Sequence, residues 1–274
     1  LLNIWYVHKR ASADDMEAYD MDSVRFQSNV PDQVYIDRIK AMNSFISLPY
    51  NDIVRNYIIL YSEKMPTKMS NILGLCEYYM PIFEEALDTY DLPLELKYLP
   101  IIESALNPKA QSRVRASGLW QFMLRTGKAY GLESNSLVDD RLDPIKATWA
   151  AARYLREMYD IYKDWHLVIA AYNCGPGNVN KAIRRAGGAT DYWSIYNYLP
   201  RETRGYVPAF IAANYIMTYY CHHNICPMNT EIIPPTDTLQ ISRELHLQQV
   251  ADVCDITIDE LKSLNPQYKR NIIP

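Results

Sequence analysis

Apolar side chains recur every three or four residues from about Asn51 to His222, and this spacing most constrains how the chain can fold. Such spacing gathers apolar groups on one face of an α-helix, whereas a half-buried strand needs alternation at every second residue. No sustained alternation occurs in this stretch. With 274 residues, of which 49% are hydrophobic, the chain can also bury a large core. We therefore predict a mainly α protein.

Caps and prolines divide this stretch into separate helices. Ser70 is expected to cap a helix in 69–90. The stretch 91–104 is expected to form another helix, and Pro100 inside it predicts a bend just before Glu103. The remaining expected helices are a short one after Pro31 and those in 51–65, 143–162, 164–173 and 208–220. Asp143 is expected to cap the helix in 143–162.

The composition changes on both sides of the helical stretch and indicates three parts. Residues 1–48 lack periodicity and are expected to form an arm on the main body, which spans 49–228. A Pro-rich linker, "NICPMNTEIIPP", begins in the last residues of this body and runs over 224–235. Residues 236–274 then form a small module, in which we expect a short strand in "DTLQIS" and helices in "LQQVADVC" and "TIDELKSLNP", the latter capped by Thr257.

Charge and cysteine content exclude several classes of protein. The formal net charge is −4 with no basic stripe, which argues against nucleic acid as a partner. No apolar run is long enough to span a bilayer, so we expect a soluble chain. Five cysteines form no regular framework. Cys221 and Cys226 suggest either a short-range disulfide or two buried thiols, and no second ligand pair supports a metal site.

Four segments place unusual polar residues in apolar or Gly-rich surroundings. They are "YLPIIESALNP" with Glu103 and Ser104, "SGLWQFM" with Trp120 and Gln121, "AAYNCGPGNV" with Tyr172 and Asn173, and "PRETRGYVPAF" with Tyr206. Each has a purely structural explanation when it is taken alone. The acid could find solvent or an arginine at a helix end, the glutamine could bind a backbone carbonyl, the tryptophan could belong to the core, and the last tyrosine is one of 23.

In this order, however, the four segments resemble the motifs E-S, G-L-[MW]-Q, A-Y-N-A-G-x-G and E-T-R-x-Y-V of one family. That family is the bacterial lytic murein transglycosylases, whose catalytic domain is similar to goose-type lysozyme. The resemblance covers about 50–225 and is greatest for a membrane-bound branch. Cys174 replaces a usual Ala, and Leu124-Arg125 replaces a segment that often contains Pro. The last residues, "ISRELHLQQVADVCDITIDELKSLNPQYKRNIIP", resemble a LysM-like unit that ends near its closing strand.

The resemblance implies a lysozyme-like helical domain that cleaves peptidoglycan at the β-1,4 bond between N-acetylmuramic acid and N-acetylglucosamine. Glu103 would donate the proton and then, as a carboxylate, accept one from the muramoyl C6 hydroxyl, which leaves a 1,6-anhydromuramoyl end. Its apolar surroundings favour the protonated form of such an acid. Most glycosidases need a second carboxylate, and none of the seven candidates is convincing: Glu95, Glu133, Asp139, Asp140, Asp143, Asp191 or Glu202, the last of which we expect just before a helix.

The resemblance also implies roles for the other motif residues. Tyr206 would lie near Glu103 and position it, with Gly205 allowing a close backbone approach. The expected substrate-binding residues are Ser104 and Gln121 on polar groups, Tyr172 and Asn173 along the sugar subsites, and Trp120 or a nearby aromatic residue stacked on a sugar face. No cofactor and no metal are expected.

The expected partners are peptidoglycan glycan strands, bound by a monomer in the bacterial periplasm. Contact with the outer membrane would come only through a lipid anchor preceding Leu1. Two alternatives stay open: a muramidase that uses water, and a non-catalytic peptidoglycan-binding protein. For the C-terminal module, sugar binding and simple packing on the catalytic domain are equally good interpretations.

Overall fold

A computed structural model describes Met21 and residues 24–230 and 238–274. Of the expected arm, 1–48, the structure describes Met21 and residues 24–48. They include α3 (Asp32–Ala41), which begins directly after Pro31 as predicted. α4 (Asp52–Ile59) follows, and the Asn51 side chain caps it by accepting hydrogen bonds from two backbone N–H groups. The helical path then continues in a π-helical turn, η1 (Leu60–Lys64).

The next helix, α5 (Pro66–Thr89), shows that one predicted cap is wrong. It begins four residues before Ser70, because Pro66 at its first positions has a backbone angle suited to a helix start. Ser70 instead lies within the helix, where its hydroxyl donates to the carbonyl of Cys226 and its own carbonyl accepts from Met228 N–H at 2.9 Å. These bonds attach the start of the linker to α5.

The segment before Glu103 also differs from the prediction. It consists of a 3₁₀ turn, η2 (Leu94–Tyr98), followed by a short helix, α6 (Leu99–Ser104). Pro100 therefore lies in the first turn of α6, where a missing N–H breaks no hydrogen bond, and not inside a longer helix. The change from one helix type to the other takes the place of the expected bend.

The rest of the main body is helical, as predicted. Its elements are α7 (Leu124–Ala129), η3 (Asp140–Leu142), α8 (Pro144–Tyr162), α9 (Trp165–Cys174), α10 (Pro176–Arg185), α11 (Tyr192–Ile195), η4 (Tyr196–Tyr198), α12 (Arg201–Tyr219) and η5 (Tyr220–His223). Asp143 caps α8 as predicted, with its side chain accepting from two N–H groups. Glu202 lies in the first turn of α12 and not ahead of it. Among the described residues of 49–228, β-structure is limited to isolated bridges.

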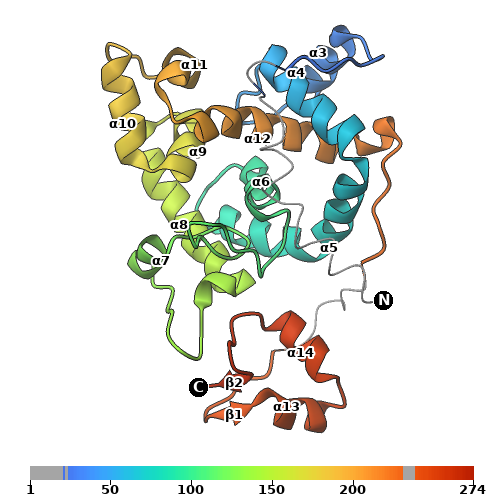
Figure 1. Cartoon of the computed structure of the whole chain (residues 1–274), viewed down its shortest axis with the longest axis vertical. Coiled ribbons are helices and arrows are strands. Elements are labelled where there is room, and N and C mark those ends of the chain that lie inside the picture. The colour runs from blue at the N-terminus through green and yellow to red at the C-terminus, as the bar shows by residue number, and fades with distance from the viewer. Residues whose placement is uncertain (1–20, 22–23, 231–237) are drawn as a thin grey trace.

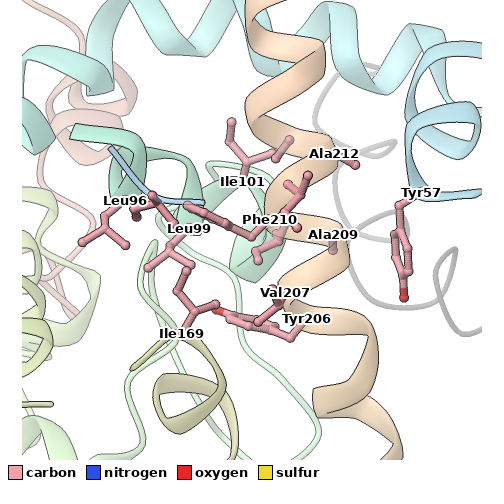
Figure 2. Close-up of a cluster of buried hydrophobic side chains, with 14 of the residues drawn as sticks. Tyr57, Leu96, Leu99, Ile101, Ile169, Tyr206, Val207, Ala209, Phe210 and Ala212 are labelled. Atoms are coloured by element: carbon pink, nitrogen blue, oxygen red, sulfur yellow. The ribbon is translucent and has the colours of Figure 1, made fainter. Parts of the chain in front are cut away.

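The core is organised around α12, which is buried almost continuously from Tyr206 to Met217. It packs against α4, α6 and α9, while α8 packs against α5 and α9. Figure 1 shows the result, in which the short α6 lies inside a ring of longer helices. Figure 2 shows the apolar side chains that meet where α6, α9 and α12 come together. Ala105, the residue after α6, adopts a left-handed conformation, so the helix ends immediately after Glu103 and Ser104.

The C-terminal module contains two helices and a two-stranded sheet. β1 (Leu245–His246) pairs antiparallel with β2 (Ile272–Ile273), and α13 (Leu247–Cys254) and α14 (Ile258–Leu264) lie between them in sequence. The predicted strand in 237–242 is wrong for 238–242, which carry none, and Asp237 lies outside the described residues. The predicted cap at Thr257 is confirmed, because its side chain accepts from Glu260 N–H.

The cysteine predictions are not met. Cys221 and Cys226 are free thiols, and both are exposed, so they form neither a disulfide nor a buried pair. Within the described ranges, no three His, Cys, Asp or Glu side chains are grouped so that they could hold a metal ion. No described helix is long and apolar enough to cross a membrane.

Candidate active site

Glu103 lies at the end of α6, close to where the apolar side chains of α6, α9 and α12 meet. Its neighbours Leu99, Ile102 and Leu106 are buried, while Glu103 itself is half-buried. Burial raises the pKa of the Glu103 carboxyl to about 7, although the hydrogen bond from Tyr206 opposes this rise. Both protonation states are therefore populated near neutral pH.

Tyr206 is directed at this carboxyl from α12. Its hydroxyl donates a short hydrogen bond to Glu103 Oε1. Figure 2 shows the ring turned toward Ile169 of α9, with Tyr57 on the opposite side of α12. A Cβ on Gly205 would lie 2.0 Å from the Tyr57 hydroxyl oxygen, so only glycine allows α12 to approach α4 this closely. The glycine beside Tyr206 thus sets the position of its helix.

Tyr172 of α9 lies near enough to the same carboxyl for the charge of Glu103 to act on it. Burial, and then the charge of Glu103, raise the pKa of Tyr172 well above its ordinary value. Its hydroxyl donates to the carbonyl of Trp120 at 2.8 Å. The tyrosine is therefore held between the acid and the loop at 117–122.

Ser104 does not lie where a substrate can reach it. The side chain is fully buried, and its hydroxyl lies 3.0 Å from the carbonyl oxygen of Pro100 and 2.9 Å from that of Leu119. Its single proton is thus engaged by backbone carbonyls. The expectation that Ser104 contacts substrate is wrong, and its position indicates a role in joining the loop to α6.

Trp120 also differs from its expected role. It is only 1% exposed, its indole N–H donates to Thr148 Oγ1 at 2.8 Å, and its ring packs edge-on against Phe83. A tryptophan whose N–H is satisfied inside the core presents no face to a sugar. The structural alternative, a core residue, is the correct one.

Gln121 and Asn173 remain accessible. The Gln121 amide nitrogen donates to the carbonyls of Gly118 at 2.8 Å and Ala110 at 3.3 Å, so a substrate contact would fall to its Oε1. Asn173 is exposed at the end of α9, and its Oδ1 accepts from the buried Thr203 hydroxyl at 2.8 Å. Thr148 and Thr203 thus hold the side chains of Trp120 and Asn173 in place. The sequence did not predict these two contacts, because each threonine lies far from its partner in the chain.

Most of the seven candidates for a second carboxylate have structural partners. In five of them the carboxylate accepts hydrogen bonds from nearby groups. Glu95 binds Ser44 and Phe45 N–H, Asp139 binds Arg141, and Asp140 binds Lys146, while Asp143 and Asp191 cap the starts of α8 and α11 by accepting from backbone N–H groups. Glu133 and Glu202 are exposed. Glu103, by contrast, lies in an apolar setting, and burial raises its pKa to about 7.

The raised pKa predicts how stability depends on pH. The folded chain holds a proton on Glu103 up to about pH 7, whereas the unfolded chain loses it near 4.5. Stability is therefore lost as the pH rises from the lower to the higher value, by at most about 3 kcal/mol. Because Gln does not titrate, Glu103→Gln should be more stable than wild type at pH 8 and nearly equal to it at pH 4. Urea unfolding at both values measures this difference, and equal stability at pH 8 would contradict the buried acid.

Comparison with known proteins finds two family models that match parts of the chain. Residues 80–195 match the family model described as the Transglycosylase SLT domain, and residues 235–274 match that of the lytic transglycosylase MltD, LysM-like domain. The membrane-bound lytic murein transglycosylase D of Escherichia coli (strain K12) is 32% identical over 228 residues, which are 82% of this chain and 50% of that protein. The chain belongs to the lytic transglycosylase family. The family, the mainly helical lysozyme-like fold and the LysM-like end were all predicted and are confirmed.

Other lytic transglycosylases match over shorter stretches. The soluble lytic murein transglycosylase of Escherichia coli (strain K12) is 34% identical over 124 residues, which are 43% of this chain and 19% of that protein. The membrane-bound lytic murein transglycosylase F of Pseudoalteromonas translucida (strain TAC 125) is 31% identical over 159 residues, half of this chain and 32% of that protein. The chain spans about half the length of the membrane-bound lytic murein transglycosylase D and less of the other two relatives. The three domain boundaries given above stay predictions.

Proposed function

We propose that this lytic transglycosylase cleaves the β-1,4 bond between N-acetylmuramic acid and N-acetylglucosamine in peptidoglycan, using Glu103 as its only acid and base. The observation that carries the proposal is the half-buried Glu103 carboxyl, whose pKa is about 7 and which accepts the hydrogen bond of Tyr206. An acid with this pKa holds its proton when the reaction begins and can release it during the reaction.

In the first step, protonated Glu103 donates its proton to the oxygen that links the two sugars. The bond between this oxygen and C1 of the muramoyl sugar breaks, and N-acetylglucosamine leaves with a hydroxyl group. Positive charge develops at C1, next to the carboxylate that the acid has become. Tyr206 keeps its hydrogen bond to this carboxylate and holds its orientation.

In the second step, the Glu103 carboxylate takes the proton of the C6 hydroxyl of the same muramoyl sugar. The C6 oxygen then bonds to C1 and closes a 1,6-anhydro ring. The acid regains its proton, and no water is consumed. Because the nucleophile belongs to the substrate, it needs no second carboxylate to activate it and gains the rate advantage of an intramolecular reaction.

Three side chains near the acid are proposed to bind the sugars. Gln121 Oε1 and the exposed Asn173 amide would contact polar substituents, and Tyr172 would border the muramoyl site between Glu103 and the loop. We propose glycan strands as the partner and the periplasm as the location, because similar proteins are named membrane-bound lytic murein transglycosylases. We also propose that the active form is a monomer.

The products of murein digestion test this proposal. We expect new muramoyl ends that weigh one water less than reducing ends, and no ¹⁸O in the products when digestion proceeds in ¹⁸O-labelled water. Reducing ends that carry ¹⁸O would instead identify a muramidase. Binding of murein without any cleavage would identify a non-catalytic binding protein.

A further inference from the structure

We propose that the C-terminal module positions the loop of Gln121 for catalysis, through contacts that run from Lys269 to Asp139 and Arg141. The inference rests on the proposed function and deepens it. The module would then affect the rate of cleavage itself, in addition to any sugar that it binds. Lys269, Asp139 and Arg141 are positioning residues in this proposal.

The module is joined to the main body by backbone hydrogen bonds. Asp139 N–H donates to the carbonyl of Gln267 at 2.9 Å, and Lys269 N–H donates to the carbonyl of Leu137 at 2.8 Å. These bonds form an antiparallel bridge between Val138 and Tyr268. Figure 1 shows the segment between α7 and α8 reaching down to the module. The contact is therefore a short piece of shared sheet.

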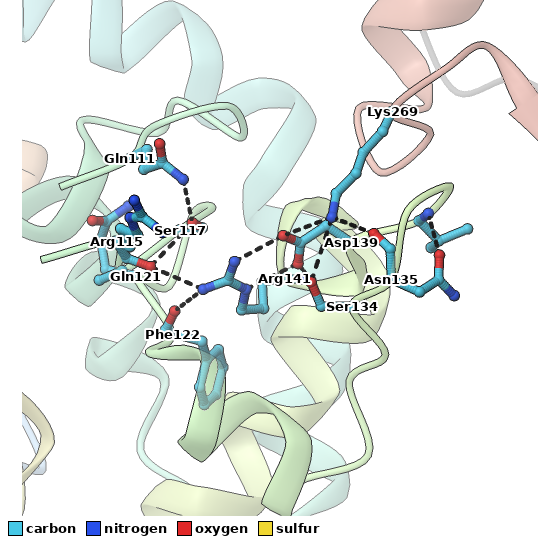
Figure 3. Close-up of polar contacts among 12 residues, drawn as sticks. Gln111, Arg115, Ser117, Gln121, Phe122, Ser134, Asn135, Asp139, Arg141 and Lys269 are labelled. Atoms are coloured by element: carbon cyan, nitrogen blue, oxygen red, sulfur yellow. Dashed lines mark hydrogen bonds and ion pairs between the residues drawn. The ribbon is translucent and has the colours of Figure 1, made fainter.

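The side chain of Lys269 extends this contact. Its ammonium group donates to the carbonyl of Asn135 at 2.6 Å and lies 3.5 Å from Ser134 Oγ and 3.8 Å from Asp139 Oδ2 (Figure 3). A positive charge from the module is thus placed beside a buried carboxylate of the main body.

Asp139 passes this contact to Arg141. Their side chains are each only 7% exposed and form two parallel hydrogen bonds, Nε to Oδ1 at 2.9 Å and Nη2 to Oδ2 at 2.8 Å. Burial acts to raise the pKa of Asp139, but Arg141 and then Lys269 outweigh it and hold that pKa below its ordinary value. A buried two-point pair of this kind fixes the orientation of the guanidinium group.

Arg141 holds the loop with the rest of its side chain. Nη1 donates to the carbonyls of Arg115 at 2.9 Å and Phe122 at 3.1 Å, and Figure 3 shows the guanidinium group between these carbonyls and Asp139. The backbones also touch, because a Cβ on Gly118 would lie 1.8 Å from the Arg141 carbonyl oxygen. Gly118 has a φ of +86°, so glycine is favoured there on both grounds.

Three carbonyls on this loop are therefore held from three directions. Ser104 on α6 binds that of Leu119, Tyr172 on α9 binds that of Trp120, and Arg141 binds that of Phe122. The first two contacts come from α6, which carries Glu103, and from α9, which carries Tyr172. The third comes from the segment on which the module docks, so a shift of the module would move the Gln121 backbone relative to the acid.

A charge reversal in the module separates this role from that of a simple sugar tether. Lys269→Glu would place a negative charge beside Asp139, whereas Arg270→Glu makes the same change at an exposed neighbour for which the described residues offer no hydrogen bond or ion pair. The substrates are intact murein and the shortest soluble glycan that wild type cleaves, which is too short to profit from a second sugar site.

We expect Lys269→Glu to lower kcat on the short glycan by about tenfold, because small misplacements of binding groups are penalised in the transition state. Arg270→Glu should keep the wild-type kcat. A tether would give the opposite pattern, with binding to intact murein weakened and kcat on the short glycan unchanged, and that result would overturn the proposal. Absence of cleavage by wild type on both substrates would instead refute the proposed function.

A second variant tests the middle of the connection. Arg141→Lys keeps a positive charge beside Asp139 but cannot bind both loop carbonyls and the carboxylate at once. We expect kcat to fall by roughly ten- to a hundredfold, with little change in KM. Hydrogen exchange at the Ser117 and Phe122 amides, which bond to each other's carbonyls, should become faster in both Arg141→Lys and Lys269→Glu. Wild-type exchange in folded Lys269→Glu would show that the module does not hold the loop.

Discussion

Glu103→Gln should abolish murein cleavage while the chain stays folded. The amide has nearly the same shape as the protonated acid and can still accept the Tyr206 hydrogen bond, but it cannot deliver a proton to the leaving oxygen or take one from the C6 hydroxyl. Loss of general acid catalysis alone typically costs a factor of about 10² to 10⁴. Here one residue serves both steps, so we expect the rate to fall by about 10⁴ or more. The release of anhydromuramoyl ends from purified murein measures it.

Glu202→Gln is the matched control. Glu202 is an exposed carboxylate in the first turn of α12, and it was one of the seven candidates for a second acid. If Glu103 works alone, this variant should cleave murein at the wild-type rate. A well-folded Glu103→Gln protein with substantial activity, or a large loss in Glu202→Gln, would each refute the single-acid mechanism.

Tyr206→Phe should slow cleavage far more than it destabilises the protein. The change removes one hydroxyl that donates to Glu103 Oε1, so the free energy of unfolding should fall by ~1 kcal/mol. The rate should fall by roughly ten- to a thousandfold, because the acid is then free to turn away from the leaving oxygen. Since this hydrogen bond lowers the pKa of Glu103, its loss should also move the alkaline decline of the pH–rate profile to higher pH.

Tyr215→Phe provides the comparison on the same helix. Tyr215 is buried on α12, where its hydroxyl accepts from Arg38 Nη1 at 2.9 Å and lies 3.0 Å from His223 Nε2, away from Glu103. Tyr215→Phe should lose at least as much stability as Tyr206→Phe and keep the wild-type rate. If Tyr206→Phe matches Tyr215→Phe in rate and in pH profile, the Tyr206 hydroxyl does not orient the acid, and Tyr206 is only a packing residue of α12.

The sequence by itself determined the helical class, most helix positions and the apolar setting that raises the pKa of Glu103. These properties depend on neighbours in the chain: apolar spacing predicts a helix, Asp143 ahead of Pro144 predicts a start, and apolar residues around Glu103 predict a raised pKa. The order of four motifs then indicated the family. Local signals failed where a neighbouring residue competed, as when Pro66 and not Ser70 began α5.

Only the tertiary structure decided which motif side chains face the acid and which support it. Ser104 and Trp120 proved to be internal supports, because their partners Leu119 and Thr148 lie 15 and 28 residues away. Tyr206 meets Glu103 across 103 residues. The attachment of the module through Lys269 had no local signal at all. A hydrogen bond depends on distance and direction between two groups, and for groups far apart in the chain these are set only when the helices pack.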